Sequence, residues 1–225
     1  MMSLSDIILR IAIIAIPLIF AVTLHEAAHG WVASKLGDRT ALMLGRVTLN
    51  PIKHIDLLGT IIIPLAMLIL SRFTFMFGWA KPVPVNWNNL HHPRRDMALV
   101  AVAGPMANLI MALLWAAIAK LTLLSQASSP LLQNIQSFIK LAGIFGVQIN
   151  AVLLILNLIP IPPLDGSRII SAILPPPLAR KYDLIEPYGI WILLGLIFIF
   201  SKALLIPVIA LSNLIFRLFG LDVSL

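Results

Sequence analysis

His25, Glu26 and His29 form the pattern His-Glu-x-x-His, whose residue types and spacing suit hydrolysis at a metal ion. On an α-helix, residues four apart share one face, so both imidazoles can bind one Zn²⁺. Glu26 need not be a ligand and can accept a proton from a water whose pKa the zinc lowers. The pattern therefore predicts two metal ligands and a general base. A buried polar cluster packed against another helix is the alternative.

The residues before this motif have the character of a membrane span. Residues 11–24 carry no charge. An ionisable group within a span costs roughly 2.5–3.5 kcal/mol on insertion scales. Three such groups in five residues need a compensating function, and metal binding is one.

The composition of the whole chain indicates an integral membrane protein. Its 225 residues are 60% hydrophobic and only 11% charged, with a mean hydropathy of +1.01, whereas soluble domains carry about 25% charged residues. We expect one domain over 1–225 and no nucleic-acid partner, because the net charge of +7 fits the basic bias of cytoplasmic loops. Without cysteine, any metal must be held by His, Asp, Glu or Asn.

We expect an all-α polytopic fold with five or six membrane segments. About 20 apolar residues cross a bilayer, so a segment of 14 residues at 57–70 favours a re-entrant segment rather than a span. The catalytic core is expected at about 7–175 and C-terminal membrane segments at about 187–219. The apolar segments are 7–36, 57–70, 97–119, 141–164 and 188–219.

A small β-hairpin or sheet is expected at the cytoplasmic membrane surface. Residues 41–50 are rich in Val, Thr and Leu with one Gly, a composition typical of strands. Residues 81–85, with two prolines, are expected to be extended and could present an edge to an extended substrate.

Basic residues test the topology of the 57–70 segment, because cytoplasmic loops carry an excess of Lys and Arg. A re-entrant segment divides 14 basic residues 11 against 3, whereas a spanning segment divides them 6 against 8. The rule therefore favours the re-entrant segment, an external N-terminus and a cytoplasmic segment 35–95. The larger group is Lys35, Arg39, Arg46, Lys53, Arg72, Lys81, Arg94, Arg95, Arg168, Arg180 and Lys181; the smaller is Arg10, Lys120 and Lys140.

A catalytic zinc usually has three protein ligands and an open position, and Asp165 is the strongest candidate for the third. It follows the apolar segment 141–164, where three prolines interrupt the helix, and it precedes Gly166, which permits a sharp turn. It can meet the His motif only if its helix runs parallel to the first, and the re-entrant topology provides this. A turn residue facing the cytoplasm is the alternative.

These residues together resemble the site-2 proteases, the zinc metalloproteases of peptidase family M50 that cut transmembrane helices within the bilayer. The resemblance rests on HEAAH at 25–29, GPMAN at 104–108 and NLIPIPPLDG at 157–166, in the family's order. NPIKHID at 50–56 and GWAKPVPVN at 78–86 are similar to the compact bacterial and archaeal branch. The resemblance covers about 20–180, and we expect the compact form without a PDZ or CBS domain.

The resemblance implies one Zn²⁺ per chain on His25, His29 and Asp165, with Glu26 as general base. It implies regulated intramembrane proteolysis of transmembrane protein substrates. It also implies a bacterial or archaeal cell membrane and an active site near the cytoplasm.

Two asparagines are weaker candidates for an oxyanion or substrate contact. Asn157 could donate such a hydrogen bond, or it could satisfy backbone groups freed by Pro160. Asn108 could contact substrate, or it could bond across to the first helix, which Gly104 lets approach closely.

Two other classes of function remain open at this point. A divalent-metal transporter would be expected to show an array of ligands along a pathway. A catalytically inactive membrane binding protein would tolerate the loss of Glu26, which this chain retains. The sequence leaves the oligomeric state undetermined.

Overall fold

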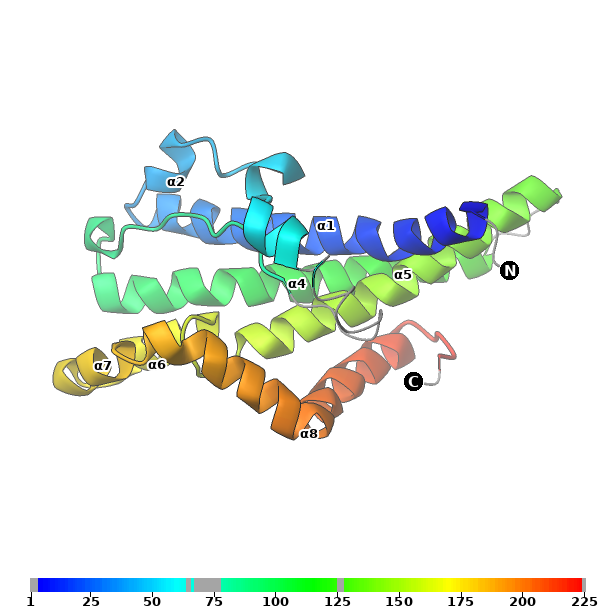
Figure 1. The fold of residues 1–225 in the computed structure, drawn as a ribbon. Helices are drawn as coiled ribbons and strands as arrows, with labels where there is room; N and C mark the ends of the chain where they lie inside the picture. Colours follow the sequence, from blue (N-terminus) through cyan, green and yellow to red (C-terminus); the bar gives the residue numbers. More distant parts are fainter. Residues whose placement is uncertain (1–3, 64–65, 67–77, 125–127, 224–225) are drawn as a thin grey trace.

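The computed structural model describes residues 4–63, 66, 78–124 and 128–223, and all the regular secondary structure of these residues is helical (Figure 1). Four helices are long: α1 (Leu4–Lys35), α4 (Pro93–Leu124), α5 (Pro130–Asn157) and α8 (Gly189–Leu218). The shorter α-helices are α2 (Thr40–Met43), α6 (Asp165–Ile173) and α7 (Pro176–Asp183). Short 3₁₀ turns at Pro51–His54, Trp87–Asn89 and Glu186–Tyr188 and a π-helical segment at Leu57–Ile62 complete the elements.

Four helical stretches of the described chain are long and apolar enough to cross a membrane. They are Ile8–Lys35, Pro93–Leu124, Pro130–Asn157 and Pro176–Phe200. Their outer faces leave large apolar side chains uncovered, such as Phe198, which is 89% exposed. A bilayer accommodates such a surface, because lipid tails take the place of water around it.

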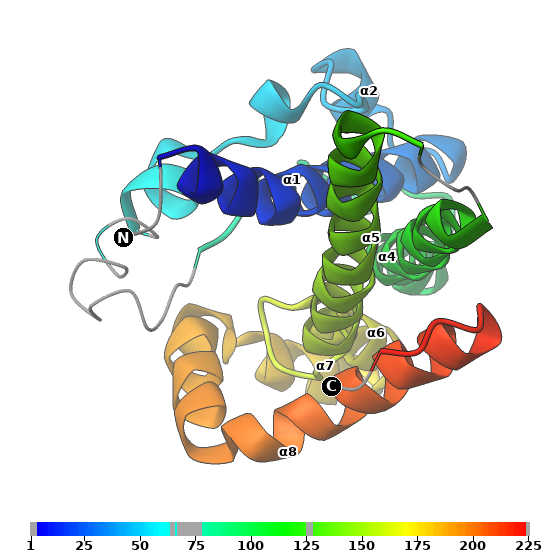
Figure 2. The same cartoon turned by 90° about the vertical axis from the view of Figure 1, so that its right-hand side faces the viewer.

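Helices α1, α4 and α5 form the centre of the molecule. Figure 1 shows α4 running back along α1, and Figure 2 shows α5 crossing both. Small residues allow the close crossing of α4 and α5. A Cβ atom on Gly143 would lie 2.7 Å from the Ala119 Cβ, and one on Gly146 would lie 2.6 Å from Trp115 Cδ2.

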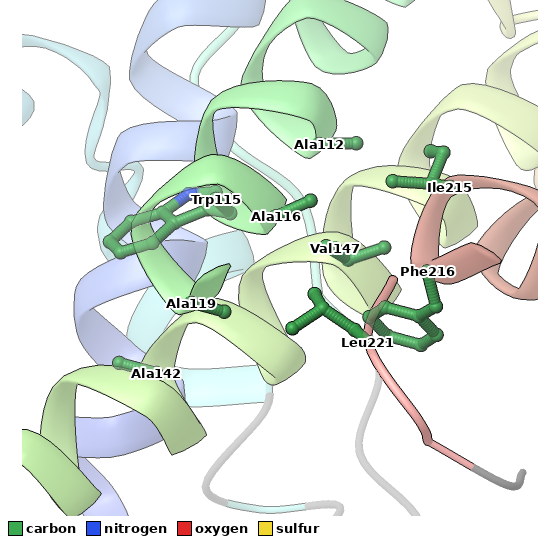
Figure 3. Packing of buried hydrophobic residues seen from close by; sticks show 9 residues of the cluster. All are labelled: Ala112, Trp115, Ala116, Ala119, Ala142, Val147, Ile215, Phe216 and Leu221. Carbon is green, nitrogen blue, oxygen red and sulfur yellow. The ribbon is translucent and has the colours of Figure 1, made fainter. Parts of the chain in front are cut away.

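A buried apolar cluster joins α4 and α5 to the last turns of α8 (Figure 3). Ile215 and Phe216 of α8 are almost fully buried against alanines of α4 and Val147 of α5. The first part of α8 leans away from this cluster, because Phe200 has non-helical backbone angles that bend the helix into two arms (Figure 1).

The expected β-hairpin or sheet is wrong, because no strand occurs among the described residues. Thr40–Met43 forms one helical turn instead, and Gly45 follows with a left-handed backbone (φ 63°). Val47 then packs its side chain against Gly30 of α1. The extended neighbour at 81–85 makes a poor ladder partner, since Pro82 and Pro84 have no N–H to donate.

One apolar segment ends earlier than expected. The described residues contain four candidate spans, whereas the expected five or six membrane segments included the re-entrant one. Residues 64–65 and 67–70 of the expected re-entrant segment 57–70 lie outside the described residues. The segment predicted at 141–164 is helical only to Asn157, because the prolines at 160, 162 and 163 cannot continue a helix.

The loop 158–164 ends at α6 and fixes where Asp165 begins that helix. Gly166 lies against the backbone of the loop, where an added Cβ would be 2.6 Å from the Ile159 carbonyl oxygen. The Tyr182 hydroxyl donates to the Pro160 carbonyl at 2.8 Å. Arg94, in the first turn of α4, donates to the carbonyls of Ala172 and Leu174 at the end of α6. Helix α6 is therefore attached to α4 and to the loop before it.

Candidate metal centre

His25, His29 and Asp165 converge between α1 and α6. Asp165 Oδ2 lies 3.2 Å from His25 Nε2 and 3.3 Å from His29 Nε2. The two Nε2 atoms are 3.1 Å apart. Both histidines are buried at 8% exposure, and Asp165 is half-buried. Within the described chain, these three residues form a group of ligand atoms that could hold one metal ion.

The chemistry of these three atoms fits a cation. Asp165 Oδ2 is buried and has no hydrogen-bond partner. When each imidazole carries its proton on Nδ1, both Nε2 atoms also present lone pairs to the same point. Three acceptors at this spacing repel one another unless a positive charge lies between them. Two imidazoles and a carboxylate are a ligand set of catalytic Zn²⁺ sites.

The Nδ1 atoms of the two histidines face acceptors that favour this protonation. His29 Nδ1 lies 2.7 Å from the Val100 carbonyl oxygen, and His25 Nδ1 lies 2.6 Å from Asn108 Oδ1. Both partners belong to α4. Such bonds from the second ring nitrogen orient a metal-binding imidazole and direct its lone pair to the metal.

Gly104 of α4 leaves the space in which the two imidazoles meet. An added Cβ would lie 2.5 Å from His25 Cε1 and 2.6 Å from His29 Cε1, and closer still to His29 Nε2. A side chain at this position would overlap the ligand atoms. The glycine therefore permits α4 to approach α1 directly over the metal centre.

Glu26 lies one residue after His25 and is half-buried. Its Oε2 accepts a hydrogen bond of 2.7 Å from the Val83 backbone N–H. The extended segment 81–85 is held beside it, because the Arg46 guanidinium donates to the Lys81 carbonyl at 2.9 Å. One oxygen of the carboxylate is thus anchored, while the other accepts no hydrogen bond within the described chain.

Asp38 secures the chain just beyond this segment. Its carboxylate is completely buried and accepts from the Asn86 N–H at 2.7 Å and from the Asn89 amide at 3.0 Å. Thr40 donates to it through both its hydroxyl and its N–H. Burial acts to raise the pKa of Asp38, but the hydrogen bonds from Thr40, Asn89 and Asn86 outweigh burial and lower it.

The two asparagines predicted as weaker site residues have different surroundings. Asn108 is fully buried next to His25 and contacts α1, as one of the two interpretations expected. Asn157 donates to the Leu153 carbonyl of its own helix at 3.0 Å and is not part of the cluster.

Sequence reasoning missed Asn150, which is fully buried in α5 and hydrogen-bonded to Asn108. The available signal was the presence of amides inside the apolar segment 141–164, since polar groups in a span require partners.

The fold and this centre define a helical membrane protein in which two histidines and an aspartate could hold a metal ion. The sequence matches the model of peptidase family M50 over residues 13–199, most of the chain. The protein belongs to peptidase family M50.

Its similarities to curated proteins agree with this assignment. It is 41% identical over 183 residues to "Putative zinc metalloprotease YwhC" of Bacillus subtilis. This match covers 81% of this chain and 78% of that protein. It is 30% identical over 179 residues to "Putative zinc metalloprotease Rip2" of Mycolicibacterium smegmatis, covering 80% and 64%. No solved structure matches the chain. The family and these relatives support a membrane-bound metalloprotease.

Proposed function

We propose that this protein is an intramembrane zinc endopeptidase that hydrolyses peptide bonds within transmembrane segments of membrane proteins. The observation that carries this proposal is the convergence of His25, His29 and Asp165 inside a membrane bundle. The two histidines lie in the C-terminal half of a helix that is apolar and long enough to cross a bilayer. A soluble substrate would have no access to such a depth, whereas a transmembrane segment reaches it laterally.

Each residue of the centre has a separate role in the proposed hydrolysis. His25, His29 and Asp165 would hold one Zn²⁺, which when bound lowers the pKa of a water molecule and polarises a carbonyl. Glu26 accepts the proton that the water loses, and it then donates this proton to the amine of the departing peptide. The Val83 N–H holds Oε2 of Glu26 in place during both transfers.

The substrate must unwind locally before it can be cut. The peptide bonds of an α-helix are covered by their own hydrogen bonds and by side chains. An extended stretch of backbone is therefore required at the centre. We further propose that the centre lies nearer the cytoplasmic side, because the re-entrant topology gives that side 11 of the 14 basic residues that were divided between the two sides.

Two substitutions test the proposal in detergent-purified protein. Glu26→Gln should retain zinc but lose cleavage of a model transmembrane substrate, because the amide cannot accept the proton. Asp165→Ala should lose zinc and activity together. Asp222→Asn, at an exposed carboxylate near the C-terminus, is the matched control and should keep both zinc and cleavage. Full cleavage by Glu26→Gln contradicts the mechanism, and full zinc occupancy in Asp165→Ala contradicts the third ligand.

A further inference from the structure

A chain of buried amides connects His25 to α5. His25 Nδ1 lies 2.6 Å from Asn108 Oδ1, and Asn108 Nδ2 donates to Asn150 Oδ1 at 3.0 Å. Asn150 Nδ2 in turn donates to the Gly146 carbonyl at 2.8 Å. Both asparagines are 0% exposed. The three long helices α1, α4 and α5 thus share one continuous path of hydrogen bonds.

The two ends of this path determine its direction. Backbone carbonyls can only accept, so Asn150 must present its NH₂ group to Gly146 and its oxygen to Asn108. Asn108 Nδ2 also donates to the Ala21 carbonyl at 3.3 Å. If the Asn108 amide were turned over, its oxygen would face two oxygen acceptors. The amide oxygen of Asn108 is therefore directed at His25, and it accepts the Nδ1 proton of the imidazole.

The two metal-binding histidines differ in how their tautomer is fixed. The partner of His29 is the Val100 carbonyl, which can only accept and which no side-chain rotation can replace by a donor. The partner of His25 is a side-chain amide, which presents either an acceptor or a donor according to its orientation. A turned amide would donate to Nδ1 and move the imidazole proton to Nε2, where it would block the metal.

We propose that Asn150 is a positioning residue of the metal centre. It fixes the orientation of Asn108, and through it the His25 tautomer that leaves Nε2 free for Zn²⁺. The proposal rests on the zinc site of the proposed function, but it concerns a residue that contacts neither metal nor substrate. It assigns a function to the only wholly buried amide of α5 among the described residues.

Zinc affinity of variants tests this assignment. Asn150→Leu keeps a similar volume but removes the acceptor, and we expect it to weaken zinc binding by roughly 10-fold, the lower range for loss of such an outer partner. Gln148→Leu is the matched control: Gln148 is half-buried on the same helix and forms no side-chain hydrogen bond within the described chain. It should bind zinc like wild type. Competition with a chromophoric chelator measures each dissociation constant.

A double substitution separates positioning from general packing. If Asn150 acts through Asn108, then Asn150→Leu should cause no further loss of zinc affinity in an Asn108→Leu background. Fold-changes that simply multiply in the double variant would overturn the proposal, as would wild-type zinc affinity in Asn150→Leu.

A measurement on wild-type protein covers the case in which these variants do not fold. The chain has five histidines, and ¹⁵N labelling of histidine in the metal-free protein reports which ring nitrogen of His25 carries the proton. We expect Nδ1, and protonation at Nε2 alone would overturn the proposal. Failure of the proposed function looks different, because wild type would then bind no zinc or would cleave no transmembrane substrate.

Discussion

Replacing Gly104 by alanine should greatly weaken metal binding while leaving the helices folded. The new Cβ would lie 2.5 Å from His25 Cε1 and 2.6 Å from His29 Cε1. Carbon atoms in contact prefer about 3.5–4.0 Å, so the imidazoles or α4 must move by roughly 1 Å. Metal–ligand distances in a working site vary by only about 0.2 Å. The displacement exceeds this tolerance several-fold, and we expect zinc affinity to fall by roughly 100-fold or more.

The assay compares zinc content after dialysis against a weak chelator, together with cleavage of a transmembrane substrate and far-ultraviolet circular dichroism. Gly195→Ala is the matched control, because a Cβ there meets nothing within 4 Å. It should keep zinc, activity and helicity. A Gly104→Ala protein that retains a full equivalent of zinc and normal cleavage would show that α1 and α4 can separate without cost, and it would refute the reasoning from close approach.

Two further outcomes follow from contacts around the centre. Val83→Pro removes the N–H that anchors Glu26. It should lower kcat by roughly 10-fold, as expected for loss of one positioning bond to the general base, and leave the zinc content unchanged. Val83→Ala keeps the N–H and should have an activity near that of wild type, so equal activity of the two variants contradicts the anchoring role. Asp38→Asn should lower stability at pH 7 by about 2 kcal/mol, since bonds to a charged group are lost. The pKa of Asp38 is lowered in the folded protein from its ordinary value of 3.8. The ionised carboxylate therefore stabilises the wild type above about pH 4, and this stabilisation is lost as the pH falls through the folded pKa. The difference in Tm between wild type and Asp38→Asn should shrink below about pH 4, and a constant difference contradicts this role of the Asp38 carboxylate.

The candidate ligands could be found from sequence because their signals are local and chemically rare. His25 and His29 satisfy a helical spacing within five residues, and few acidic residues follow an apolar segment as Asp165 does. The direction of the chain at Asp165 could be inferred as well, since the prolines of the loop 158–164 end the preceding helix. The geometry that joins α1 to α6 depends on contacts more than 100 residues apart, and only the structure provides it.

Other features escaped prediction for identifiable physical reasons. Residues 41–50 have the composition of a strand, but packing of Val47 against Gly30 of α1 determines their path. Asn150 was not singled out from the sequence, because its hydrogen-bond partner lies on another helix. The anchoring of Glu26 by Val83 is a main-chain contact, and no residue type encodes it. Composition describes what a segment prefers alone, whereas these positions are decided by neighbours distant in sequence.

Because the candidate ligands are divided between α1 and α6, the ribosome synthesises the third one well after the first two. Asp165 follows His29 by 136 residues (165 − 29), and the spans of α4 and α5 lie between them. At 5–20 residues per second, a ribosome needs roughly 7–27 s to bridge this interval. During that time the nascent chain carries Glu26 and two candidate ligands but lacks the third. The candidate metal centre therefore stays incomplete until α6 has been synthesised.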